Sequence, residues 1–377
     1  MEEKIRILHV LGGLNRGGAE TMIMNVYRKI DRSKIQFDFV IHTSNKCDYD
    51  DEIKALGGRI YSLPRYTGKN HFFYKKTWDS FYKQHPEYKI VHGHVRSTAV
   101  IYLRSAKKYG KVTIVHSHNT SSGKGFSATV KNAMQYPIRY IADYLFACSY
   151  HAGTWLFGNK ACKKDNFFIL NNAIDAKAFI FDEKKRMEKR NEFGIEDKYI
   201  VGHIGRFDLQ KNHEFLIDIF KEVHDKNEKA VLMLIGDGYL RPYIEKKVAD
   251  LELSNSVIFT GVRSDIPDLL NAIDVFLFPS LFEGLGIVAI EAQACGIHCI
   301  VADTVPQEAY LTDLIEEISL KSSVSSWSEN VLKYLSGYDR RNTYDEISQK
   351  GYNIEETSKW VEDFYLKIMK VDDENNE

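Results

Sequence analysis

The sequence predicts an α/β protein built from two Rossmann-like domains, each with a parallel sheet, that face each other across a cleft. Three observations predict this fold. Short apolar, β-branched runs alternate with amphipathic helical stretches along most of the chain, which is typical of parallel sheets buried on both faces. The pattern restarts after a stretch rich in Lys and Glu, residues 182–198. A length of 377 residues also suits two domains better than a single core.

Ten runs have the composition of buried strands, five on each side of that stretch. They are residues 7–11, 37–42, 90–94, 112–116 and 145–149, followed by residues 200–204, 231–235, 257–260, 275–279 and 299–302. We expect residues 1–172 to form an N-terminal domain and residues 173–354 a C-terminal domain. A last helix over residues 355–370 is expected to pack back onto the first domain. Ligands of open parallel sheets bind beyond the carboxyl ends of the strands, so functional residues are expected in the loops that follow these runs.

The cysteines and the apolar runs restrict the location of the protein. The five cysteines form no C-x-x-C pair, so we expect neither structural disulfides nor a zinc site, and a reducing compartment. There is no signal-peptide pattern at the start and no apolar run of about 18 residues. The sequence therefore predicts a cytoplasmic protein and leaves open peripheral binding to the inner face of the cell membrane. The D-Y-D sequence at residues 48–50 is interpreted as a solvated loop rather than a metal site.

The charge is distributed unevenly along the chain. Residues 1–172 contain 27 Lys and Arg against 13 Asp and Glu, a net charge of +14, and the remainder carries −15. Either the two halves drifted independently, or the basic half faces an anionic membrane leaflet or a phosphate-bearing acceptor. Residues 61–89 combine bases with aromatic rings, which suits a membrane interface, single-stranded nucleic acid, or an amphipathic helix that buries its rings. An anionic membrane surface is kept as a candidate partner, and no nucleic-acid partner is expected.

A glycine-rich loop, Gly12–Glu20, follows the first predicted strand and enters a helix. Glycines let the backbone approach a ligand, and the amides at a helix N-terminus favour an anion. The spacing is not that of a G-x-G-x-x-G dinucleotide fingerprint, and no acidic residue ends the second strand. The alternative is a tight turn without a ligand.

Four histidines, His92, His94, His116 and His118, end two successive predicted strands. No Cys or carboxylate joins them at ligand spacing, so no metal site is predicted. We expect His92 and His116 to be hydrogen-bonded structural groups. His118, which is followed by Asn119, is the functional candidate.

Two cations, Arg206 and Lys211, follow the first strand of the second domain. Arg can form a bidentate fork and Lys acts as a point charge, so the pair can converge on a diphosphate. The alternative is a solvated basic loop. Gly236, at the end of the next strand, predicts only a sharp turn.

The segment Phe282–Glu291 follows the fourth strand of the second domain. Its glycines place a helix N-terminus, with free backbone amides, at the cleft. Glu283 lies at the turn, and Glu291 lies eight positions later on an otherwise apolar helix face. Carboxylates accept hydrogen bonds from sugar and ribose hydroxyls, and a carboxylate among apolar residues is costly unless it has a partner. The alternative is one acid at a helix start and one that is partly exposed.

Taken together, these motifs resemble those of retaining glycosyltransferases of family 4, which have the GT-B fold. The resemblance rests on Glu283-x7-Glu291, on Gly205-Arg206 with Lys211, and on the loop Gly12–Glu20. Asn171–Asp175 is similar to the domain junction of the family, from which Asn172 and Ala173 depart. The first 45 residues and the segment His116–Thr120 are similar to a narrower group, the bacterial exopolysaccharide and capsule glycosyltransferases.

The resemblance implies a metal-independent hexosyltransferase that needs no cofactor and retains the anomeric configuration. It would move a sugar from a nucleotide-sugar, UDP being the expected nucleotide, to a lipid-linked or saccharide acceptor in exopolysaccharide or capsule synthesis. The resemblance implies catalytic roles for Arg206, Lys211, Glu283 and His118, and donor binding by Gly13, Gly17, Gly205, Gly236, Phe282, Gly284, Leu285, Gly286 and Glu291.

Two alternatives share this architecture. One is a nucleotide-sugar 2-epimerase, which would convert the donor without any acceptor. The other is a non-catalytic homologue that binds a nucleotide. A NAD-dependent oxidoreductase fits the predicted folds but lacks the glycine fingerprint.

Overall fold

The computed structural model of the protein describes residues 4–118, 126–334 and 336–376, apart from the side chains of residues 126–128 and 371–376. The chain forms two compact units. The first unit comprises residues 1–174 together with residues 351–377, and the second comprises residues 175–350. This division falls two residues beyond the expected boundary at residue 172. The five cysteines are free and buried.

The first unit contains a seven-stranded parallel sheet with the order β3-β2-β1-β4-β5-β6-β7. Its strands are β1 Ile5–Val10, β2 Ile35–Ile41, β3 Ile60–Ser62, β4 Ile90–Gly93, β5 Val112–Ser117, β6 Tyr144–Ala147 and β7 Phe167–Ile169. Its helices are α1 Gly18–Lys29, α2 Asp50–Ala55, α3 His71–Gln84, α4 Ala99–Lys108, α5 Phe126–Gln135, α6 Ile138–Ile141, α7 Tyr150–Phe157, η1 Ala161–Lys163 and α15 Ile354–Asn376.

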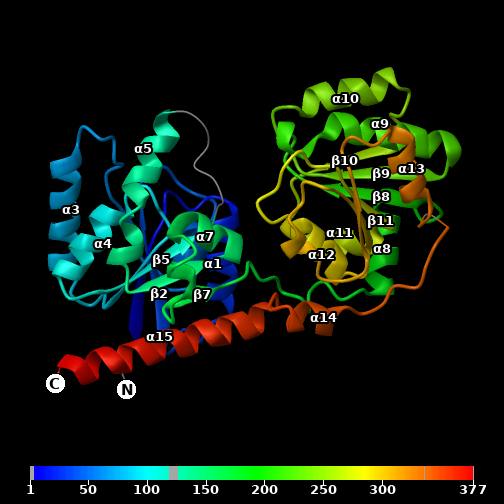
Figure 1. Cartoon of the computed structure of the whole chain (residues 1–377). Coiled ribbons are helices and arrows are strands. Elements are labelled where there is room, and N and C mark those ends of the chain that lie inside the picture. Colours follow the sequence, from blue (N-terminus) through cyan, green and yellow to red (C-terminus); the bar gives the residue numbers. More distant parts are fainter. Residues whose placement is uncertain (1–3, 119–125, 335, 377) are drawn as a thin grey trace. The chain divides into compact units, whose positions relative to one another are not determined.

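Both faces of this sheet are covered, which explains why its strands are continuous apolar runs. Along β1, Ile7 belongs to the core on one face, whereas Leu8 and Val10 belong to the core on the other. The long helix α15, drawn in red in Figure 1, runs along the first unit and contributes Phe364 and Tyr365 to the core that also contains Ile7. The last helix thus covers part of one face of a sheet whose first strand lies near the other end of the chain.

The second unit contains a six-stranded parallel sheet with the order β10-β9-β8-β11-β12-β13. Its strands are β8 Tyr199–Ile204, β9 Ala230–Ile235, β10 Val257–Gly261, β11 Val275–Phe278, β12 His298–Ala302 and β13 Ile315–Ile318. Its helices are α8 Glu183–Phe193, η2 Leu209–Lys211, α9 His213–Lys226, α10 Arg241–Asp250, α11 Ile266–Ala272, α12 Ile287–Ala294, η3 Gln307–Ala309, α13 Val324–Leu332 and α14 Tyr344–Gln349. None of the helices in the described part of the chain is long and apolar enough to cross a bilayer.

The fold class predicted from the sequence is confirmed, because both sheets are parallel and carry helices. The ten expected strands are present, but three further strands, β3, β7 and β13, were missed. They are three or four residues long and lie at sheet edges, where part of each strand is exposed, so they lack a continuous apolar run. The stretch at residues 182–198, which separates the two series of strands, contains α8, and Asp182 caps this helix by accepting from the backbone N–H of Lys184 at 2.8 Å.

In each sheet the strand order reverses at one point, between β1 and β4 in the first unit and between β8 and β11 in the second. The loops that follow such a pair of strands turn to opposite faces, which opens a crevice at the carboxyl edge. The motifs with a predicted role in donor binding or catalysis follow these four strands, except Gly236 after β9 and the histidines of β5.

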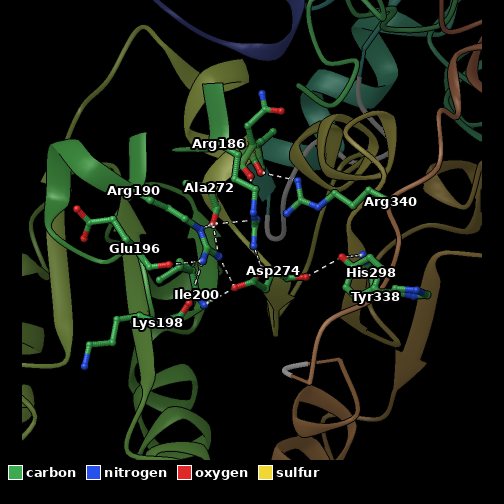
Figure 2. Close-up of polar contacts among 12 residues, drawn as sticks. Arg186, Arg190, Glu196, Lys198, Ile200, Ala272, Asp274, His298, Tyr338 and Arg340 are labelled. Atoms are coloured by element: carbon green, nitrogen blue, oxygen red, sulfur yellow. Dashed lines mark hydrogen bonds and ion pairs between the residues drawn. The ribbon is translucent and has the colours of Figure 1, made fainter. Parts of the chain in front are cut away.

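At the opposite edge of the second sheet, Asp274 joins several elements (Figure 2). Its carboxylate accepts from Arg186 at 2.5 Å, from Arg190 at 2.6 Å and from the backbone N–H of Ile200 at 2.7 Å. Arg190 also donates to the carbonyl oxygen of Ala272 at 3.0 Å. The side chains of Asp274 and Arg190 are only 11% and 6% exposed. This buried network therefore ties α8 to the starts of β8 and β11.

We expect Asp274→Ala to lower the free energy of unfolding of the protein by about 3–5 kcal/mol, because it leaves Arg190 buried without a counter-ion. Urea unfolding followed by circular dichroism measures the change. The matched control is Asp313→Ala. Asp313 forms an ion pair with Arg341, and the Asp313 side chain is 82% exposed. This control should cost less than about 1 kcal/mol. Equal losses in the two variants would contradict the role of the network.

Candidate functional site

The loop between β1 and α1 is fastened to the loop that follows β2. The backbone N–H of His42 donates to the carbonyl oxygen of Gly12 at 3.2 Å, and the backbone N–H of Arg16 donates to Asp48 at 3.0 Å. The expectation that residues 48–50 are simply solvated was wrong. Asp48 holds the glycine loop, and Asp50 is buried and accepts from the backbone N–H of Cys47.

The glycines of this loop differ in what they make room for. A Cβ atom at Gly12 or Gly18 would meet nothing within 4 Å, so the backbone there is open to a ligand. A Cβ at Gly17 would lie 2.4 Å from the carboxylate of Glu20, which folds back over it. A Cβ at Gly13 would make only ordinary van der Waals contacts, at 3.7 Å. Burial raises the pKa of Glu20.

Five histidines from β1, β4 and β5 form a row at the carboxyl edge of the first sheet. His94 lies in the middle: its Nε2 is 3.1 Å from Nδ1 of His9, and its Nδ1 is 2.8 Å from Nε2 of His118. His92 and His116 stack on this row, with ring centroids 4.5 Å from His94 and 4.0 Å from His118. The sequence analysis missed His9, although it pairs in register with His92.

Three of these residues carried expectations, of which one holds and two change. His92 is hydrogen-bonded as expected, to the hydroxyl of Tyr365 at 2.7 Å. His116 is not: neither of its ring nitrogens has a partner among the described residues. His118 lies at the edge of a cavity, but its Nδ1 is buried and its Nε2 faces His94. Asn119 lies outside the described residues.

All five imidazoles are neutral at physiological pH. Burial lowers the pKa of His9 and His118 to about 3, and it lowers those of His92, His94 and His116 well below 6.5. His9, His94 and His118 therefore each carry one N–H proton. The two hydrogen bonds that join these three rings must then be donated in the same direction along the series. Several ring nitrogens come within 4.8 Å of one another, as in a metal site. The rings of His92 and His94, and those of His116 and His118, are stacked, however, whereas a metal ion lies in the plane of each imidazole that binds it.

A cavity of about 460 Å³ opens beside this row, lined by Gly12, Gly18, Glu20, His94, Arg96, His118, Lys131 and Asn172, among others. An adjoining cavity of about 970 Å³ shares Gly12, Val95, Ser97 and Lys131 with it. The carboxyl edge of the first sheet thus presents a hollow with room for a ligand.

In the second unit, the loops after β8 and β11 are joined by an ion pair. The ammonium group of Lys211 lies 2.6 Å from Oε1 of Glu283, and Gln210 donates to Oε2 of Glu283 at 3.2 Å. Both side chains are mostly buried, and the ammonium group also lies 4.6 Å from the centre of the Phe278 ring. Arg206, in the same loop as Lys211, is exposed and has no side-chain partner among the described residues. The structure therefore brings together Lys211 and Glu283 and leaves Arg206 free.

The loops after β8 and β9 pack against each other at glycine residues. A Cβ at Gly236 would lie 2.1 Å from the carbonyl oxygen of Gly205, and Gly236 has a φ of 136°, which other residues rarely adopt. A Cβ at Gly238 would lie 2.5 Å from the carbonyl oxygen of Phe207. These two glycines let the loops pack closely, a role that the sequence analysis did not assign to Gly238.

Glu291 lies on α12, which begins directly after Gly286. Its side chain is half-buried and its carboxylate has no hydrogen bond within the described ranges. Burial raises the pKa of Glu291 to about 8. Before α12, Phe282 is 60% exposed, Gly284 borders open space and Leu285 is half-buried. The start of α12 thus offers an unpartnered carboxyl group and a free backbone.

Two family profiles match the chain, one in each unit. The profile described as "Glycosyltransferase Family 4" matches residues 16–178, and the profile described as "Glycosyl transferases group 1" matches residues 185–353. Together they span nearly all of both units.

Curated relatives match over most of the chain. The putative glycosyltransferase EpsF of Bacillus subtilis (strain 168) is 35% identical over 93% of this chain and 94% of EpsF. The UDP-Gal:alpha-D-GlcNAc-diphosphoundecaprenol alpha-1,3-galactosyltransferase of Escherichia coli is 25% identical over 80% of each chain. The capsular polysaccharide biosynthesis glycosyltransferase CapH of Staphylococcus aureus is 23% identical over 96% of this chain and 99% of CapH.

Among solved structures, HepE of Anabaena in complex with UDP and glucose superposes with a TM-score of 0.73 at 17% identity. The match covers 96% of this chain and 99% of HepE. At this identity the likeness shows the fold, and it is the GT-B fold that the sequence predicted.

Proposed function

The chain belongs to the group 1 glycosyltransferases of family 4, and on that premise we propose that it transfers a hexose from a UDP-sugar with retention of configuration. The acceptor in this proposal is a lipid-linked saccharide used in the synthesis of an exopolysaccharide or capsule. The observation that carries the proposal is the set of polar groups at the carboxyl edge of the second sheet. Within the described part of the chain, Arg206 and the carboxyl group of Glu291 have no partners there, beside the pair of Lys211 and Glu283.

The proposed donor site follows from the chemistry of these groups. Arg206 and Lys211 hold the diphosphate and stabilise the negative charge that develops when the glycosidic bond breaks, which needs only fixed positive charge. Glu291 accepts from the ribose hydroxyls. Glu283, held by Lys211, accepts from the sugar hydroxyls beside the backbone of Gly284, Leu285 and Gly286. UDP as the nucleotide is supported by the UDP-Gal in the name of the E. coli relative and by the UDP bound in HepE.

The proposed reaction needs no protein nucleophile. The acceptor hydroxyl attacks the face from which the diphosphate departs, so configuration is retained and the leaving phosphate takes the proton. His118, neutral because its pKa is lowered to about 3, contacts the sugar rather than supplying a charge. In the first unit, Gly13 and the open backbone of the glycine loop approach the donor phosphates, and Gly17 leaves room for Glu20.

The acceptor in this proposal is supported by the relatives. The name of the E. coli enzyme specifies an acceptor sugar on diphosphoundecaprenol, and that of CapH specifies capsular polysaccharide biosynthesis. The helix α3 fits a membrane-bound acceptor. Four of its aromatic side chains are buried, but Phe72 and Phe73 are 86% and 60% exposed beside the exposed Lys75 and Lys76. Exposed rings next to lysines suit an anionic bilayer surface.

We expect Arg206→Ala and Lys211→Ala each to lower kcat by roughly 100- to 1,000-fold, because each removes a charge that stabilises the leaving diphosphate. Sugar transfer from a panel of UDP-sugars to a bacterial lipid extract is the assay, with circular dichroism to confirm folding. The control is Lys221→Ala, a lysine on α9 paired with the exposed Asp225, which should keep normal turnover. Near-normal turnover in both site variants would reject the site, and an epimerised donor formed without any acceptor would reject transfer.

The affinity for UDP should rise with pH if Glu291 accepts from the ribose. A carboxyl group with a pKa of about 8 is protonated at pH 6 and ionised at pH 9. The dissociation constant of UDP should therefore fall by up to about tenfold per pH unit between pH 6 and 8, and level off above pH 8. Calorimetric titration measures this slope, and Glu291→Gln, which stays neutral, should lose it. An equal slope in both proteins would exclude Glu291 as its cause.

The membrane proposal is tested by flotation with vesicles that contain anionic phospholipid at low salt. Replacing Phe72 and Phe73 together by Ser should release most of the bound protein, because the exposed rings no longer enter the interface. The control replaces Tyr239 and Val262, which are 68% and 71% exposed in the second unit, by Ser. Binding that survives the first replacement, or is lost in the control, would argue against α3 as the contact.

A further inference from the structure

Arg96 is a cation in the first unit that has no counter-ion among the described residues. It follows β4, at the reversal of strand order, and its guanidinium lies 4.8 Å from the centre of the Trp155 ring. Its Nη1 atom is buried and has no hydrogen-bond partner among the described residues. Burial lowers the pKa of Arg96, and no carboxylate offsets this effect. A guanidinium nitrogen that is buried without an acceptor is costly, which indicates that the partner of Arg96 is a ligand.

The cavity of about 460 Å³ places this cation next to a second one. Arg96, half-buried, and Lys131, exposed on α5, both line it. Glu20 also lines the cavity but forms no ion pair with either cation in the described structure. The histidines of the row are neutral, so they add no charge. The two cations therefore outnumber the one carboxylate of the cavity lining, and the guanidinium fork of Arg96 matches the oxygens of a phosphate.

The adjoining cavity of about 970 Å³ has a different lining. It shares Lys131 and Ser97 with the first cavity, and it reaches Tyr66, Val130 and Met134. Val130 is 42% exposed although it is apolar. The cavity with two cations is thus continuous with a wider one, and Lys131 lies at the junction. The wider cavity also contains polar side chains, among them Arg65 and Thr98, but its α5 side, formed by Val130 and Met134, is apolar.

We propose that Arg96 and Lys131 bind the diphosphate of a lipid-diphosphate acceptor. The start of the lipid chain lies in the larger cavity along Val130 and Met134, and the acceptor sugar lies at the Glu20 and Asn172 end of the smaller one. This inference rests on the proposed function for the transfer itself, but the anion site is a property of the first unit and can be measured without any transfer.

The test is calorimetric binding of geranyl diphosphate, a short soluble prenyl diphosphate, to the full chain saturated with UDP. Arg96→Ala should weaken this binding by at least tenfold, and Arg96→Lys should recover part of it, because the charge returns without the fork. Arg104→Ala, which removes an exposed arginine of α4, is the matched control and should bind normally. Met134→Asp should remove the advantage of geranyl diphosphate over inorganic pyrophosphate while pyrophosphate itself still binds.

Two results would overturn the proposal. One is unchanged geranyl diphosphate binding in folded Arg96→Ala protein. The other is an equal loss of UDP affinity in that variant, which would assign Arg96 to the donor. If instead Arg96→Ala loses geranyl diphosphate while the wild-type protein binds UDP but transfers no sugar from any UDP-sugar, the anion site stands and the proposed transfer fails.

Discussion

Every strand of both sheets runs in the same direction as its neighbours, and this constraint determines where the chemistry of the protein lies. In a parallel sheet all strands end at one edge, so the loops that follow them meet there, while both faces are buried under helices. The reversal of strand order, at β1 and β4 and again at β8 and β11, opens that edge. The glycine loop, the end of the histidine row, Arg206, Lys211 and the start of α12 all lie beyond these four strands or the adjacent β5.

The two edges of the second sheet differ in how completely their buried polar groups are partnered. The carboxyl edge contains the paired Lys211 and Glu283 as well as an unpartnered carboxyl group. At the amino edge, the carboxylate of Asp274 is fully matched by two arginines and a backbone amide, so this edge contributes stability. At the carboxyl edge, Glu291 is half-buried with no partner in the described structure, and its pKa rises to about 8. An unmatched group is a cost to the folded chain that a ligand can remove. The same reasoning applies to Arg96 in the first unit.

The histidine row shows how a sheet accommodates polar side chains at the border between core and cavity. Neutral imidazoles stack and bond to one another, so five of them fit where five charges would not. The row also limits what His118 can do. Because Nε2 of His118 faces Nδ1 of His94, the tautomer of His118 depends on the tautomer of His94. His94 therefore positions the residue that the sequence singled out.

The sequence by itself determined the α/β class, ten of the strands and the loops that carry Arg206, Lys211, Glu283 and Glu291, because buried parallel strands are continuous apolar runs and their ends are marked by glycine and charge. It missed β3, β7 and β13, since short edge strands are half-exposed and carry no such run. Only the tertiary structure decided which side chains have partners: it joined Lys211 to Glu283 and left Glu291 and Arg96 without a partner among the residues that the structure describes. These outcomes depend on contacts between residues far apart in the chain, which local composition does not record.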